Sequence, residues 1–234
     1  MVLTGLMLLA SGILFGNKWW EARNNPEASF ALPVAWPEIL GSQLARPGLI
    51  LGSLLILLMV ASEFSWRTAR QNVIDGLSKA AWFRGKIGVL LLVGILFLSI
   101  QTGMGIAFAA AGNETWSPEI LFPGIQGLNA MGKILLAYLG YGSLALLVAI
   151  IVRSPGPAVG VWFLYAAAGE RLLATILRTF NSPQIDAALL FLPVNLFNSL
   201  LGYGSQNPAV ITVSICWTVF FIGISYIVHR NRDL

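Results

Sequence analysis

The chain has 234 residues, of which 57% are hydrophobic and 10% charged, and its formal net charge is +4. A soluble domain carries charge on about a quarter of its residues, so this chain has too few charges to cover a water-facing surface. We therefore predict an integral membrane protein that forms a single domain over residues 1–234. In such a protein a basic excess marks cytoplasmic loops and predicts no nucleic-acid partner. The one cysteine, Cys216, excludes an internal disulfide and a cysteine-based metal site.

Six apolar runs follow one another along the chain. They lack the alternation with period two that barrel strands require, so we predict an all-α, polytopic membrane protein with six transmembrane helices. The predicted spans cover residues 2–16, 47–62, 87–112, 134–152, 158–180 and 209–228. The first run is short for a span, and we expect Met1 to lie in or near a helix whose lead-in is missing or very short.

The basic residues predict an orientation for these spans. Placing the loop of residues 63–86 in the cytoplasm brings both termini to that side and puts eight basic residues there, against six outside. The eight are Arg67, Arg70, Lys79, Arg84, Lys86, Arg153, Arg230 and Arg232. We expect a multi-pass protein of the cell membrane, specifically the bacterial inner membrane.

The loop of residues 63–86 is itself amphipathic. From Glu63 to Leu77 there is no proline and one glycine, so a helix is permitted. The apolar residues expected on one side are Trp66, Val73, Ile74 and Leu77, and the polar residues expected on the other are Arg67, Thr68, Gln71 and Asp75. Arg70 falls among the apolar positions, where its long stem can lie along the surface. The simplest interpretation is a loop that only sets topology; the alternative is a helix that binds another protein or the membrane surface.

Residues 181–208 separate the fifth and sixth predicted spans. Their apolar part, residues 187–201, is too short to cross a bilayer comfortably, and Pro193, Asn195 and Asn198 interrupt it. We predict a re-entrant or interfacial pair of short helices on the outer side rather than a seventh span.

Several of these segments together resemble the ABC-2-type transporter permeases. The resemblance is carried by Glu63, residues 67–72 (RTARQN), residues 76–78 (GLS) and Lys86, by the six-span layout, and by the stretch FLPVNLFNSL at residues 191–200. It implies that residues 67–77 form a coupling helix that docks into a groove on a separate cytoplasmic ABC ATPase subunit, where ATP and Mg²⁺ would bind. The implied coupling residues are Arg67, Thr68, Arg70, Gln71, Val73, Ile74 and Leu77.

Two motifs that suggest catalysis are rejected on physical grounds. The stretch GLNAMGKI at residues 127–134 resembles a phosphate-binding loop, but Ile134 stands where Ser or Thr must hold magnesium. Ser205 and His229 would lie about 36 Å apart along a helix, far beyond the reach of a catalytic dyad. We therefore predict no catalytic residues, no metal site and no cofactor bound by this chain itself, which makes it a non-enzymatic subunit.

Charged residues within the fifth predicted span are unusual and form a candidate intramembrane polar site. The site consists of Glu170, Arg171 and Arg178. A charge near the bilayer centre costs about 2.5–3.5 kcal/mol on insertion scales, so these residues need partners. Either they form structural pairs in a polar bundle interior, or they line a substrate route or a dimer seam.

Two functional hypotheses remain. The first is the permease subunit of an ABC exporter that works by alternating access. It would pair with a second copy of itself or a similar permease, and a separate ATPase would power it. The second is a non-transporting membrane scaffold or accessory subunit that uses the same loop to hold a cytoplasmic protein.

Overall fold

The computed structural model describes residues 45–112, 124–180, 182–201 and 208–232, together with ten scattered helical positions between residues 5 and 24. Its helices are α3 (Ala45–Ser65), α4 (Thr68–Ile74), α5 (Lys79–Gly112), α6 (Gly124–Val152), α7 (Pro155–Leu164), the π-helix η2 (Tyr165–Gly169), α8 (Glu170–Arg178), α9 (Pro183–Leu189), α10 (Pro193–Ser199) and α11 (Pro208–Asn231). The described part of the chain is all-helical, as the sequence predicts. About half of the first predicted span, residues 2–16, lies outside the described residues.

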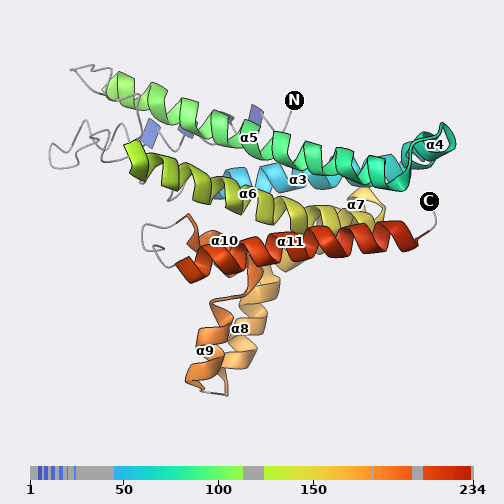
Figure 1. The fold of residues 1–234 in the computed structure, drawn as a ribbon. Helices are drawn as coiled ribbons and strands as arrows, with labels where there is room; N and C mark the ends of the chain where they lie inside the picture. The colour runs from blue at the N-terminus through green and yellow to red at the C-terminus, as the bar shows by residue number, and fades with distance from the viewer. Residues whose placement is uncertain are drawn as a thin grey trace.

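Four of the described helices are long and apolar enough to cross a membrane: Arg46–Ser65, Lys79–Met104, Gly127–Val152 and Pro208–Asn231. They correspond to the second, third, fourth and sixth predicted spans. In Figure 1 these helices, α3, α5, α6 and α11, run side by side along one direction. The chain is therefore a membrane-embedded helical protein, in line with its composition.

Helix α6 is the centre of this bundle. Its apolar stretch is 67% buried, against 22% for that of α11. The reason is its small side chains, which let neighbouring helices approach closely; Ala137, Ser143, Ala145 and Ala149 are fully buried. Helix α11 buries a stripe that consists of Ser214, Thr218, Phe221, Ser225 and His229.

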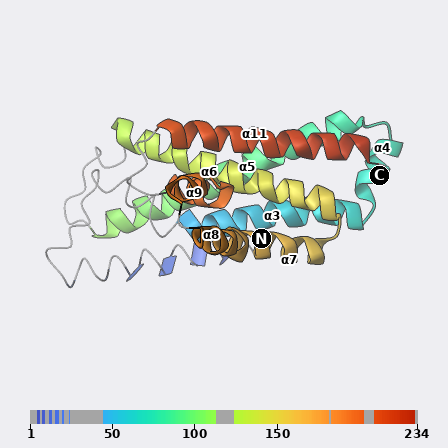
Figure 2. The ribbon, with the colours of Figure 1, turned by 90° about the horizontal axis from the view of Figure 1, so that it is seen from below.

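The fifth predicted span is not one straight helix. Helix α7 begins after Ser154 with Pro155 in its first turn and ends at Leu164, where the π-helix η2 follows. Figures 1 and 2 show that α8 then leaves the bundle direction and that α9 runs beside it, so that both helices are seen end-on in Figure 2. A π-turn inserts an extra residue into the helical ladder, which redirects the residues beyond it.

Residues 183–199 form two short helices, α9 and α10, as expected for this segment. Each begins with a proline at its first position, which suits a helix start because proline lacks the N–H that would be unsatisfied there. Helix α10 returns to the bundle and buries Pro193, Val194, Leu196 and Phe197. It thereby closes one side of a cavity next to α6.

Candidate functional site

Two regions gather the residues that the sequence singles out: the end of the bundle that carries α4, and a polar cavity beside α10. At the first, α4 is set off from α3 by Arg67, which adopts a left-handed conformation (φ 59°, ψ 13°). Gly76 (φ 98°) ends α4, with its N–H donating to the carbonyl of Val73 and that of Leu77 donating to the carbonyl of Asn72. This is the Schellman arrangement that glycine favours after a helix.

These two breaks make α4 shorter than the predicted helix of residues 67–77, and they change its faces. Ala69 is 1% exposed and Val73 is half-buried, so these two face the bundle. Trp66 and Ile74 are 75% and 67% exposed, and Leu77 is exposed in the turn after the helix. The single helix predicted over residues 67–77, with its apolar residues on one side, is therefore not present. Trp66 and Leu77 lie outside α4 because the backbone turns at Arg67 and Gly76, and Ile74 lies within α4 but is exposed.

The polar coupling residues predicted from the resemblance lie on the surface of this end. Arg67, Thr68, Arg70 and Gln71 are all exposed. The Gln71 amide donates to the Asp75 carboxylate at 3.0 Å, and the Thr68 hydroxyl donates to the carbonyl of Glu63 at 3.2 Å. Neither of these hydrogen bonds involves the guanidinium group of Arg67 or Arg70.

The two ends of the loop are joined at Glu63. One carboxylate oxygen forms an ion pair with Lys86, and the other accepts a hydrogen bond from the indole N–H of Trp82 at 3.0 Å. The Lys86 ammonium also lies 4.8 Å from the centre of the Trp82 ring. Because Trp82 is buried, these contacts fix the last turn of α3 to the first turns of α5. We call Glu63, Trp82 and Lys86 the loop clamp.

The end of α11 packs against the same place. His229 is buried and stacks on Trp82, with ring centroids 4.5 Å apart. The Lys79 ammonium donates to the carbonyls of Arg230 and Arg232, and the Arg232 guanidinium donates to the carbonyl of Ile151 at 2.9 Å. The eight basic residues predicted for one side of the membrane thus belong to elements that meet at one end of the bundle, next to the C-terminus in Figure 1.

The second region is organised by Glu170, which is 3% exposed. Its carboxylate accepts hydrogen bonds from the Tyr165 hydroxyl at 2.8 Å and from the backbone N–H groups of Val194 and Asn195 at 2.8 and 2.9 Å. Those two N–H groups belong to the first turn of α10, where a helix has no acceptors of its own and favours a negative charge. Glu170, which belongs to α8, therefore caps the start of α10. This is a structural role, one of the two alternatives that the sequence left open for this charge.

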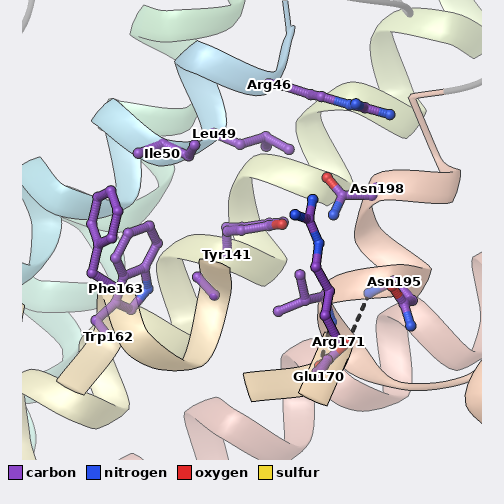
Figure 3. Close-up of a pocket in the computed structure, with 12 residues that line it drawn as sticks. Arg46, Leu49, Ile50, Tyr141, Trp162, Phe163, Glu170, Arg171, Asn195 and Asn198 are labelled. Carbon is purple, nitrogen blue, oxygen red and sulfur yellow. Dashed lines mark hydrogen bonds between the residues drawn. The ribbon is translucent and has the colours of Figure 1, made fainter. Parts of the chain in front are cut away.

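Next to Glu170 lies a cavity of about 380 Å³, which we call the polar cavity. Its lining comes from α3, α6, α7, η2, α8 and α10 and consists of Arg46, Leu49, Ile50, Tyr141, Trp162, Phe163, Ala166, Glu170, Arg171, Val194, Asn195 and Asn198. Figure 3 shows the Arg171 guanidinium beside the Tyr141 hydroxyl and Asn198, with Arg46 beyond them. Arg178, at the far end of α8, is not part of the lining.

The structure thus brings together two of the three residues of the predicted intramembrane site and adds others. Arg46, Tyr141, Trp162 and Asn198 were not identified as site residues from the sequence. Their segments lie far apart along the chain, and only the folding of α7 and α10 back onto α3 and α6 makes them neighbours. The two asparagines within an apolar stretch were the one available signal.

Two observations concern metal and nucleotide binding by the described residues. No group of three or more His, Cys, Asp or Glu side chains gathers among them. Residues 127–134, which resemble a phosphate-binding loop in sequence, lie within the continuous helix α6. The chemistry available in the polar cavity is hydrogen bonding and charge, from guanidinium, amide and phenol groups.

These features define a polytopic helical membrane protein with a polar cavity and an anchored basic loop. Residues 6–234 match the family described as "Protein of unknown function (DUF2705)", and the chain belongs to that family. It is also similar to "Uncharacterized protein YhcI" of Bacillus subtilis (strain 168), with 26% identity over 194 residues. That match covers 75% of this chain and 61% of the relative, so the chain spans less than two thirds of the relative's length.

Proposed function

We propose that this chain is the membrane permease subunit of an ABC-2-type transporter, in a bacterial inner membrane, and that α4 is its coupling helix. The proposal includes six spans, the first in residues 2–16 and the fifth formed by the broken run from α7 to α8. A separate cytoplasmic ATPase would hydrolyse ATP, and two permease chains would alternate between inward-open and outward-open states to export a substrate.

The observation that carries the proposal is the mounting of α4. A coupling helix must expose the side chains that its partner recognises, and its two ends must be fixed to the transmembrane helices that it moves. Arg67, Thr68, Arg70 and Gln71 are exposed, whereas Ala69 is buried against the bundle. The loop clamp holds both helices that flank α4, so a push on α4 would be passed directly to α3 and α5. A loop that only sets topology has no need of this attachment.

A small hollow beside α4 adds a place for a partner side chain. It has a volume of about 220 Å³ and is lined by Phe64, Arg67, Ala69 and Arg70. Two of its four residues are arginines, which suits an acidic or carbonyl-rich surface on the ATPase.

The test is a charge reversal, Arg67→Glu, in the chain expressed with its candidate ATPase. Arginine and glutamate incur a similar cost in the left-handed conformation at this position, and the side chain is exposed, so folding and membrane insertion should be unchanged. Co-purification of the ATPase should fall at least about fivefold, because a charge repulsion of about 1 kcal/mol or more replaces an attraction. The readout is the ratio of ATPase to permease after gentle purification.

Arg84→Glu is the matched control. Arg84 is also an exposed arginine at this end of the bundle, but it belongs to α5. Reversal at Arg84 should leave the ATPase ratio unchanged. An equal loss with both variants, or no loss with Arg67→Glu, would contradict α4 as the coupling element.

The second candidate function is a scaffold or accessory subunit that anchors a cytoplasmic protein through the same loop. The exposed arginines of α4 favour it as much as they favour coupling. The two are separated by ATP hydrolysis: a permease alters the ATPase rate of its partner, and this alteration disappears with Arg67→Glu, whereas a scaffold leaves the rate per bound ATPase unchanged.

A further inference from the structure

The polar cavity holds two guanidinium groups that form no hydrogen bond or ion pair with acceptors among the described residues. Arg46 comes from the first turn of α3 and Arg171 from the first turn of α8. Both are close enough to the Tyr141 hydroxyl to interact with it electrostatically. Both arginine side chains are exposed, so an anion can reach their guanidinium groups from outside the bundle.

Glu170 does not fill this role. Its two oxygens already accept hydrogen bonds from Tyr165, Val194 and Asn195, and adjacent residues of a helix point apart. Among the described lining residues, two arginines therefore stand against one carboxylate, and the Asn198 amide lies next to Arg171 (Figure 3). Guanidinium and amide groups arranged in this way recognise the oxygens of phosphate and carboxylate.

The opposite wall of the cavity is apolar and aromatic. Leu49 and Trp162 are buried there, and Trp162 has an indole N–H without an acceptor among the described residues. Ile50 and Phe163, at 38% and 48% exposed, continue this wall onto the outer surface of α3 and α7. A ligand with an anionic group and a hydrocarbon part would fit both walls at once, and it could enter from the bilayer beside Phe163.

The depth of the cavity agrees with such a ligand. Tyr141 lies eleven residues before the end of α6 and Arg46 nineteen residues before the end of α3. The cavity therefore extends from about 16 to about 28 Å along the bundle from the end that carries α4. A volume of about 380 Å³ is in the range of small-molecule sites and suits a headgroup, with the chains left in the bilayer.

We propose that the polar cavity binds the phosphate group of an amphiphile, with Arg46 and Arg171 as its ligands and Trp162 and Phe163 along its apolar part. As a binding site it is independent of ATPase coupling; only as the cargo site would it rest on the permease function proposed above. Binding can therefore be measured on the isolated chain, so that loss of coupling and loss of this site are separate results.

The test compares three ligands on the purified chain in detergent, with dissociation constants measured by native mass spectrometry. Dioctanoyl phosphatidic acid has both phosphate and chains, dioctanoylglycerol has only the chains, and glycerol 3-phosphate has only the phosphate. We expect phosphatidic acid to bind at least about tenfold more tightly than either of the others, since charged hydrogen bonds to phosphate contribute at least about this factor.

Variants then locate the site. Arg46→Gln and Arg171→Gln should each weaken phosphatidic acid binding about tenfold, and Arg178→Gln, which removes an exposed arginine from the same helix but outside the cavity, should not. Equal binding of phosphatidic acid and dioctanoylglycerol, or equal effects of the three variants, would overturn the proposal. Glycerol 3-phosphate binding as tightly as phosphatidic acid would also overturn it, in favour of a soluble phosphate. If the variants fail to fold, the three-ligand comparison on the unaltered chain decides.

Discussion

At the scale of single residues, two carboxylates connect segments that are distant in sequence. Glu63 joins the end of α3 to Trp82 and Lys86 of α5, and Glu170 joins α8 to the first turn of α10. A charge in an apolar environment is stable only when its hydrogen-bonding capacity is filled. Glu63 and Glu170 each accept hydrogen bonds from more than one residue. Glu63 thereby holds the helices that flank α4, and Glu170 holds the start of α10.

Removal of the Glu63 carboxylate should destabilise the chain in graded steps. Glu63→Gln keeps an oxygen that can accept the Trp82 bond but loses the ion pair, and should lower the free energy of unfolding by about 1 kcal/mol. Glu63→Ala loses both contacts and should lower it by about 2 kcal/mol. Chemical unfolding in detergent measures the difference. Asp75→Asn is the control, because the Asp75 carboxylate accepts a hydrogen bond from the exposed amide of Gln71; a loss as large as that of Glu63→Ala would contradict the role of the loop clamp.

Glu170→Gln should loosen α10 specifically. A glutamine places an NH₂ group where a carboxylate oxygen accepts a backbone N–H, so at least one hydrogen bond is lost and two donors face each other. We expect a destabilisation of about 2 kcal/mol and faster hydrogen exchange at Val194 and Asn195. Tyr165→Phe removes one of the same three bonds and should cost about 1 kcal/mol with no change in exchange at those two amides. Unchanged exchange in Glu170→Gln would show that the cap does not hold α10.

At the scale of elements, the contact between α6 and α10 depends on a missing side chain. A Cβ at Gly140 would clash with three ring atoms of Phe197, which is fully buried. The ring also packs against Tyr141, with centroids 5.9 Å apart, so a shift of the ring would disturb this contact. The glycine therefore positions α10, and with it one wall of the polar cavity.

Gly140→Ala should consequently displace α10 and destabilise the chain by about 1–3 kcal/mol, the usual cost of overpacking a core. Gly132→Ala is the control on the same helix, because a Cβ there meets no atom within 4 Å; it should be neutral or slightly stabilising. Thermal unfolding of the two variants side by side makes the comparison. Equal melting temperatures would contradict close packing of α10 at Gly140.

The helices also show which sequence patterns predicted secondary structure correctly. The long apolar runs correctly predicted α3, α5, α6 and α11, since length and composition are sufficient for a spanning helix. Pro193 and the asparagines correctly predicted short helices near residue 190. The helical pattern of residues 63–77 was less reliable, because the left-handed turn at Arg67 and the stop at Gly76 restrict α4 to Thr68–Ile74. A turn at arginine has no strong sequence signal.

At the scale of the whole molecule, eight of the twelve described basic residues belong to elements at one end of the bundle. The end with α4, Lys79, Arg153 and Arg232 is basic, and it is joined by hydrogen bonds between α5, α6 and α11. The start of α6 lies at the other end (Figure 1). This asymmetry predicts the membrane orientation, with the basic end in the cytoplasm.

Cysteine labelling measures that orientation. In a Cys216→Ser background, Thr68→Cys and Arg230→Cys should resist a membrane-impermeant maleimide in intact cells, and Ile125→Cys, whose parent side chain is 88% exposed, should react. All three should react after the cells are opened, which controls for accessibility. Reaction of Thr68→Cys in intact cells would place α4 outside and would contradict its coupling role.

The sequence by itself determined that this is a helical membrane protein, where most of its spans lie and which end is basic. These properties depend on the free energy of transferring short stretches of chain from water to lipid, which is a sum over neighbouring residues. The loop clamp, the cap on α10 and the polar cavity were decided only by tertiary structure. The clamp and the cap depend on hydrogen bonds between residues 19 to 25 positions apart, and the cavity is lined by residues from Arg46 to Asn198. No local pattern encodes which of many possible partners a carboxylate or an arginine will meet.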